Sequence, residues 1–172
     1  TLTGSTPTAV TTSLDDDRTV TVTAYGPVNE ASAYAMFKVD ATPGYAMDLA
    51  LQAATSGTAA TISGFTFEFS VNGGSSWTTY DATHKPTVPA GGTFFVRVTM
   101  TGEVDTTFEG AETFALKASY STNTAKSAAA DTSIVDDNTG STYLSTLTGS
   151  TPTAVTTSLD DDRPVFSVAD VM

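Results

Sequence analysis

The stretch FTFEFSVNGGSSW, residues 65–77, decides the fold class of this chain. Phe65, Phe67 and Phe69 alternate with polar residues, which is the period-two pattern of a β-strand with one buried face. Asn72 and Gly73 follow, and both residue types tolerate the positive φ of a tight turn. The stretch therefore predicts a strand that runs into a β-hairpin, with Trp77 covering one sheet edge.

The same alternation returns at regular intervals along the chain. It occurs at residues 19–25, 35–41, 48–54, 94–100, 113–119 and 131–135, with turn sequences such as TPGYA and VPAGGT between. No window keeps helical periodicity for a dozen residues, and the best helical candidate, residues 123–131, is short and polar. About seven short antiparallel strands predict an all-β, immunoglobulin-like antiparallel β-sandwich. We expect its core to contain Val39, Phe65, Phe67, Phe69, Phe94, Val96, Phe114 and Leu116.

A long exact repeat indicates how the domain is used. TLTGSTPTAVTTSLDDDR occupies residues 1–18 and returns unchanged at residues 146–163. An offset of 145 residues is the size of a whole domain, so we expect one period of a tandem array. The expected units are a linker from the preceding repeat (1–18), a sandwich domain (19–138), a linker or extension (139–163) and the truncated start of the next repeat (164–172).

The composition excludes several classes of partner. Lys and Arg number 7 against 19 Asp and Glu, for a net charge of −12, which disfavours nucleic acid and anionic membranes. No apolar run approaches the ~20 residues that cross a bilayer, so no membrane insertion is expected. The chain has no Cys, which excludes disulfides and thiolate metal sites.

Most of the acidic residues lie at the ends of predicted strands, where their mutual repulsion costs energy. A divalent cation would offset that cost, and Ca²⁺ accepts about 6–8 oxygen ligands in a forgiving geometry. Zinc is disfavoured because there is no Cys and only one His.

Part of the sequence resembles the Calx-β family. The acids and the Phe-Glu-x-x-Glu-x-Phe pattern of that family are similar to EVDTTFEGAETFAL (103–116). Its final strand, which runs into aspartates, is similar to DTSIVDDN (131–138), and its opening is similar to VNEASAYAMFKV (28–39). The resemblance covers about residues 19–138 and implies a seven-stranded sandwich that binds Ca²⁺ at one end. The positions that it assigns to metal ligands are Glu30, Asp105, Glu109, Glu112, Asp136 and Asp137.

Tandem Calx-β-like modules joined by LDDDRP-type linkers resemble the repeat regions of giant bacterial surface adhesins secreted by type I systems. This resemblance implies an extracellular, cell-surface spacer whose partners are the neighbouring repeats, and which Ca²⁺ stiffens outside the cell. The resemblance does not identify a receptor.

The aspartates of the repeated segment carry two open interpretations. Asp15, Asp16 and Asp17, and likewise Asp160, Asp161 and Asp162, precede the first strand of a repeat and would point alternately to opposite sides of extended chain. They could bind Ca²⁺ and lock the angle between domains, with a flexible hinge in its absence. Alternatively they are a solvated charge run that keeps a linker soluble.

The sequence also bears on two functions other than that of a spacer. Tyr25, Tyr34, Tyr45, Trp77 and Tyr80 could line a face of a calcium-dependent carbohydrate- or protein-binding module, although packing on the sandwich surface is the favoured explanation for them. An enzyme is not expected, because His84 has no nucleophile motif nearby and Glu109 and Glu112 are too close in sequence to face each other across a sugar.

Overall fold

The computed structural model describes residues 16–54, 56–100, 103, 105–148, 151–155 and 159–164. These residues form strands, turns and irregular chain without any helix, which confirms the all-β prediction. Accordingly, the described ranges hold no helix with the length and apolarity that crossing a membrane requires.

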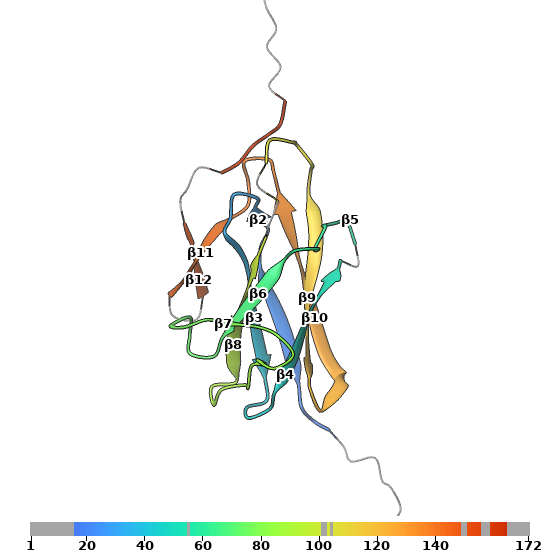
Figure 1. Ribbon diagram of the computed structural model, residues 1–172, viewed down its shortest axis with the longest axis vertical. Coiled ribbons are helices and arrows are strands. Elements are labelled where there is room, and N and C mark those ends of the chain that lie inside the picture. Colours follow the sequence, from blue (N-terminus) through green and yellow to red (C-terminus); the bar gives the residue numbers. More distant parts are fainter. Residues whose placement is uncertain are drawn as a thin grey trace, which may run out of the picture.

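One sheet contains five antiparallel strands (Figure 1). Their order is β1 (Val20–Tyr25), β3 (Tyr34–Ala41), β8 (Thr93–Thr99), β6 (Thr66–Ser70) and β7 (Thr78–Thr79). Strands β6 and β7 form the hairpin that Asn72 and Gly73 predict, with Phe69 opposite Thr78.

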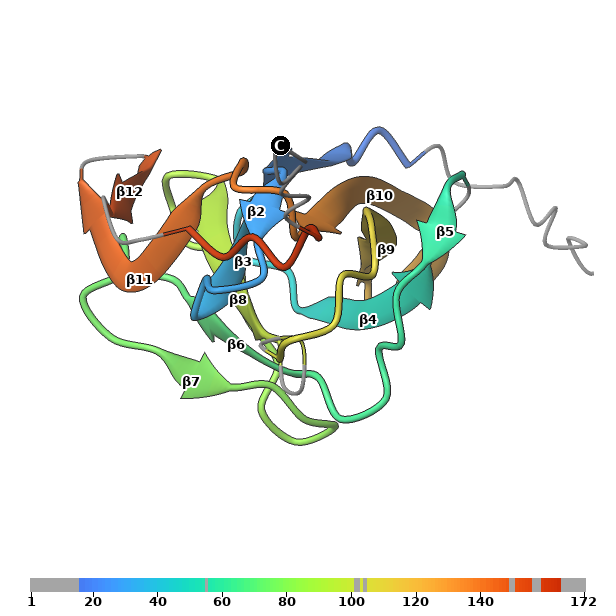
Figure 2. The same cartoon turned by 90° about the horizontal axis from the view of Figure 1, so that it is seen from above.

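The second sheet faces the first, so that the domain has two layers (Figure 2). Its order is β2 (Val28–Asn29), β10 (Asn123–Val135), β9 (Glu112–Tyr120) and β4 (Met47–Ala53), and β5 (Thr58–Ala59) also pairs with β9. The long strands pair antiparallel, whereas the two-residue strands β2 and β5 run parallel to their neighbours. All seven stretches with the alternating pattern overlap a strand of these two sheets.

Residues 123–131, the best helical candidate, belong to strand β10, so that candidate is wrong. Residues Ser127 to Ile134 pair with β9 from Ser119 to Glu112, after an irregularity that follows Asn123. Pairing with a central strand satisfies the backbone groups and overrides the helix propensity of the alanines.

The segment 139–163, expected to be a linker or extension, contains the hairpin of β11 (Thr142–Thr148) and β12 (Thr151–Val155). Tyr143 is buried with the core. Its amide donates to the hydroxyl of Ser32 at 2.8 Å, and the amide of Ser141 donates to the carbonyl of Pro27 at 3.1 Å. The first part of the segment therefore packs on the domain that precedes it.

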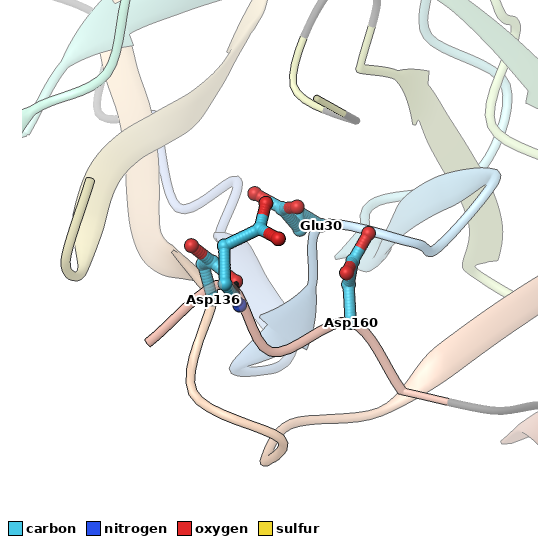
Figure 3. Close-up of side chains that lie close together, drawn as sticks. Glu30, Asp136 and Asp160 are labelled. Atoms are coloured by element: carbon cyan, nitrogen blue, oxygen red, sulfur yellow. Dashed lines mark hydrogen bonds between the residues drawn. The ribbon is translucent and has the colours of Figure 1, made fainter. Parts of the chain in front are cut away.

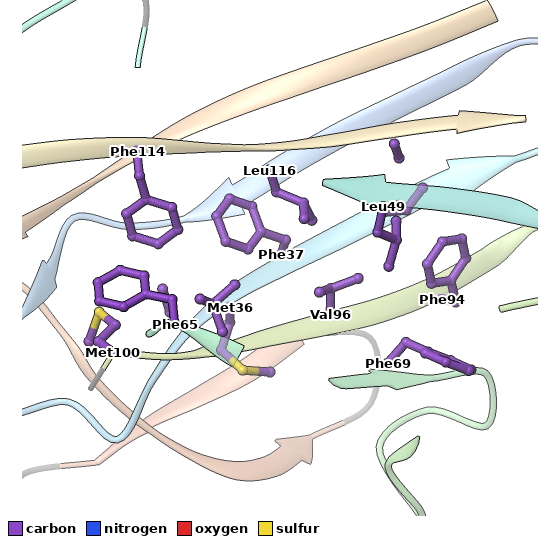
Figure 4. Packing of buried hydrophobic residues seen from close by; sticks show 14 of the residues in the cluster. Met36, Phe37, Leu49, Phe65, Phe69, Phe94, Val96, Met100, Phe114 and Leu116 are labelled. Carbon is purple, nitrogen blue, oxygen red and sulfur yellow. The ribbon is translucent and has the colours of Figure 1, made fainter. Parts of the chain in front are cut away.

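The core lies between the two sheets (Figure 4). The ring of Phe114 meets Phe37 and Phe65 edge to face, with centroid distances of 6.0 and 5.5 Å. Seven of the eight predicted core residues are buried, and Phe67, which is partly buried, stacks on Tyr80 at 4.9 Å. Alternation identified the inward face because the side chains of a strand point to opposite sides in turn.

Tyr120, at the end of β9, anchors the start of the domain. Its hydroxyl donates to the carbonyl of Thr19 at 2.6 Å and accepts from the amide of Thr42 at 2.8 Å, while its ring is fully buried. We expect Tyr120→Phe to lower the unfolding free energy by about 1–3 kcal/mol, because both backbone groups lose their partner. Urea unfolding followed by tryptophan fluorescence measures this loss, and an unchanged midpoint would contradict it.

Candidate metal centre

Four carboxylates meet at one end of the sandwich, and the pairing of two strands explains why. Strand β2 lies parallel to the end of β10, with Asn29 opposite Val135, so the residues that follow both strands leave the sheet at the same edge. Those residues are Glu30 and Asp136. The amide of Glu30 donates to the carbonyl of Val135 at 3.1 Å, which fixes the two chains side by side.

The other two carboxylates come from the second copy of the repeated segment. Buried Asn29 holds Asp160, because its Oδ1 accepts from the Asp160 amide at 2.9 Å and its Nδ2 donates to the Asp160 carbonyl at 3.1 Å. The amide of Asn138 also donates to the Asp160 carbonyl at 3.0 Å, and the amide of Asp162 donates to Oδ1 of Asp136 at 2.9 Å. Figure 3 shows the carboxylates of Glu30, Asp136 and Asp160 where these segments come together.

The acid cluster, meaning Glu30, Asp136, Asp160 and Asp162, is incompletely paired, and its members are buried or partly buried. Glu30 is 3% exposed and Asp136 2%. Oε1 of Glu30, Oδ2 of Asp136 and Oδ2 of Asp162 are buried and find no hydrogen-bond donor among the described residues. Buried anionic oxygens without a partner are costly, so they indicate a missing positive group.

The pKa values in the acid cluster also indicate a missing positive group. Burial raises the pKa of Glu30 to about 8, with further contributions from the negative charges of Asp136, Asp160 and Asp162. The pKa of Asp162 is also raised, first by burial and then by Asp160 and Asp136. The protein alone therefore disfavours the charged form of these groups, and a bound cation would reverse that preference.

The donor set fits a hard cation. One ligand oxygen from each of the four residues lies within 4.8 Å of the others. Two oxygens that share one Ca²⁺ at about 2.4 Å are at most about 4.8 Å apart, so this spread suits a common ion. The acid cluster could thus hold a metal ion with oxygen ligands alone.

A second group of acids, Glu103, Glu109 and Glu112, lies at the start of β9. Their carboxylate oxygens also come within 4.8 Å of one another. Burial, followed by the charges of Glu112 and Glu109, raises the pKa of Glu103 to about 7. Glu109 is exposed, and none of the buried unpaired oxygens of the described residues belongs to this group. This group is therefore a weaker candidate than the acid cluster.

The remaining predicted ligands that the structure describes belong to neither group, although the charge of Asp105 helps to raise the pKa of both Asp162 and Glu103. Oδ1 of Asp137 accepts from the amide and hydroxyl of Thr139, and exposed Asp105 accepts from the amide of Thr107 at 2.6 Å. Asp161 pairs with Arg163, and Asp16 pairs with Arg18. Asp17 is exposed, and Asp15 lies outside the described residues.

Two residues of these sites were missed as candidates. Glu103 belongs to the same acidic stretch as Glu109 and Glu112, and its place in that stretch was the available signal. Asn29 provides no ligand, but it positions Asp160, and nothing in the sequence distinguishes it from other polar residues of strands.

The five aromatic residues that could line a binding face pack against other parts of the domain. The Arg97 guanidinium lies 4.4 Å from the ring centre of Tyr34 and 4.5 Å from that of Trp77. Tyr80 stacks on Phe67, Tyr45 packs edge to face on Tyr120, and Tyr25 is partly buried against the core. His84 forms an exposed pair with Asp81 at 2.8 Å.

Comparison with known proteins adds no relatives. No protein-family model matches the chain, and no curated protein matches its sequence.

Proposed function

We propose that this chain is a non-enzymatic, calcium-binding repeat that serves as a structural extender in a large secreted or cell-surface bacterial adhesin. The observation that carries the proposal is the acid cluster, whose buried oxygens on Glu30 and Asp136 lack donors. Ca²⁺ suits these ligands, because it prefers oxygen and tolerates irregular geometry.

The strand order supports an immunoglobulin-like domain of the Calx-β kind. Strands β1, β3, β8 and β6 stand in the order A, B, E, D of such sandwiches, and β4, β9 and β10 in the order C, F, G. Asp136 of the acid cluster directly follows β10, where the resemblance expects ligands after the final strand.

The arrangement of the chain supports a spacer. Residues 16–19 enter at one end of the long axis and residues 159–164 leave at the other (Figure 1). Repeats connected in this way would add length with each copy. Because two of the four acids come from the exit segment, Ca²⁺ would fasten that segment to the domain and stiffen the connection. Extracellular calcium levels would favour this state by mass action.

Calorimetric titration of the full chain with Ca²⁺ tests the proposal. We expect saturable binding, and Glu30→Gln should weaken it roughly 10- to 100-fold, because one buried anionic ligand becomes neutral. Glu109→Gln is the matched control in the second group of acids and should keep the tightest site. Absence of binding heat, or equal affinity of parent and Glu30→Gln, would contradict the assignment.

A further inference from the structure

The two copies of the repeated segment can be compared residue by residue within one chain. With the offset of 145, Asp16 corresponds to Asp161, Asp17 to Asp162 and Arg18 to Arg163. Residues 16–18 of the first copy lie at the entry end of the domain, and residues 160–163 of the second copy lie at the exit end (Figure 1). Identical sequence therefore occurs in two different surroundings.

The local conformation is the same in both places. Nε of Arg18 donates to Oδ1 of Asp16 at 2.7 Å, and Nε of Arg163 donates to Oδ1 of Asp161 at 2.7 Å. The arginine amide donates to that same Oδ1 in each copy, at 3.1 and 3.3 Å. The Asp–Arg pair is thus a preformed unit of the segment, independent of what surrounds it.

At the entry end, the Asp–Arg pair is docked on the domain that follows it. The guanidinium of Arg18 lies 4.5 Å from the ring centre of Tyr45 and 4.7 Å from that of Tyr120. It also donates to the hydroxyl of Thr122 at 3.0 Å, and Asn123 donates to Asp16 at 2.8 Å. The neighbouring residue Asp17 is exposed.

At the exit end, the same segment uses its opposite side. Asp160 and Asp162 belong to the acid cluster of the domain that precedes them, while the Asp–Arg pair is more open. The Arg163 side chain is 52% exposed there, against 18% for Arg18 at the entry end. Among the three residues that the structure describes in both copies, each copy therefore buries more of the side that the other copy leaves exposed.

We infer that the repeated segment is a two-sided joint between consecutive copies of this domain. Asp160 and Asp162 bind the cation of the domain before the joint. Asp161 and Arg163 dock on the domain after it, in the way that Asp16 and Arg18 dock on Tyr45 and Tyr120. The partner of the exposed Asp161–Arg163 pair is thus a second copy of this domain. This inference rests on the proposed function, because it needs both the cation and the tandem array.

In this joint, no freely moving residue separates the contacts to one domain from the contacts to the next. Successive residues of extended chain point to opposite sides and advance about 3.4 Å each, so a ligand to one domain and a contact to the next sit on adjacent residues. With the cation bound, all four residues from Asp160 to Arg163 are held. Loss of either side would restore a flexible connection.

A tandem protein tests the joint. Residues 1–163 followed directly by residues 19–172 place the second copy of the segment between two identical domains. The chain has no Cys, so Ala82→Cys, at an exposed turn, gives one spin label in each domain. Pulsed electron paramagnetic resonance then measures the distribution of distances between the labels in Ca²⁺. We expect a narrow distribution of distances for the parent tandem protein. Arg163→Ala at the joint should make this distribution roughly twice as wide.

Arg18→Ala in the same tandem protein is the matched control. Arg18 makes these contacts on the first domain, at the start of the tandem protein and away from the joint. Its removal should therefore leave the width of the distance distribution equal to that of the parent. A broad parent distribution in Ca²⁺, no widening with Arg163→Ala, or equal widening with Arg18→Ala would overturn the inference. Calorimetry on the same samples separates the two proposals: Ca²⁺ binding without these changes refutes the joint alone, whereas absence of binding refutes the proposed function.

Discussion

Asp136→Asn is expected to abolish most of the rise in melting temperature that Ca²⁺ produces. At a Ca²⁺ concentration about 100 times Kd, binding stabilises the folded chain by about 2.7 kcal/mol, or roughly 8 °C for a protein of this size. Asp136 is 2% exposed and its Oδ2 is unpaired, so the substitution removes a buried anionic ligand at constant size. Its Oδ1, which accepts from the amide of Asp162, is retained in Asn.

The same variant should behave in the opposite way in chelator. There burial and the neighbouring acids disfavour negative charge in the acid cluster without compensation, so removal of one carboxylate should leave the stability equal to that of the parent or above it. A change that destabilises only in Ca²⁺ is the signature of a ligand, since a packing defect would destabilise in both conditions.

Asp137→Asn provides the control from the adjacent residue. Asp137 accepts from Thr139 within its own turn, and Asn can accept the same bonds. Differential scanning calorimetry of parent and both variants, in Ca²⁺ and in chelator, completes the comparison. The assignment fails if Asp136→Asn keeps the full shift, or if Asp137→Asn loses as much.

Gly140→Ala should cause the second large effect, a loss of about 3 kcal/mol in unfolding free energy. Gly140 has φ of 78°, and a Cβ there would lie 2.7 Å from the amide nitrogen of Asn29 and 2.9 Å from the carbonyl carbon of Val28. The left-handed conformation costs an L-residue about 1–2 kcal/mol, and forcing the backbone of β2 aside costs about 1–3 more. Because Asn29 positions Asp160, Ca²⁺ affinity should fall as well.

Gly44→Ala separates the two contributions to that loss. Gly44 has φ of 85°, but a Cβ there meets nothing within 4 Å, so only the conformational cost of about 1–2 kcal/mol applies. Urea unfolding in chelator measures both variants. Equal losses would show that the close approach of Gly140 to β2 has no energetic weight.

The candidate site was only partly predictable. Glu30 and Asp136 were identified through the resemblance, and their meeting depends on the parallel pairing of β2 with β10. A two-residue strand carries too little pattern to be recognised in sequence. The choice of Asp136 over Asp137 follows from the point at which β10 ends, because adjacent side chains point to opposite sides.

The sequence by itself determined the all-β class, the positions of the long strands and most of the core. These properties follow from local alternation, which is written in consecutive residues. It also determined that one eighteen-residue segment occurs twice. Only the tertiary structure decided that identical aspartates have different roles: Asp17 is exposed at the entry end, whereas Asp162, its counterpart in the second copy, belongs to the acid cluster. The reason is physical: the charge of a side chain is set by its own residue, but its surroundings in the fold include residues far away in the sequence, such as Glu30 for Asp162.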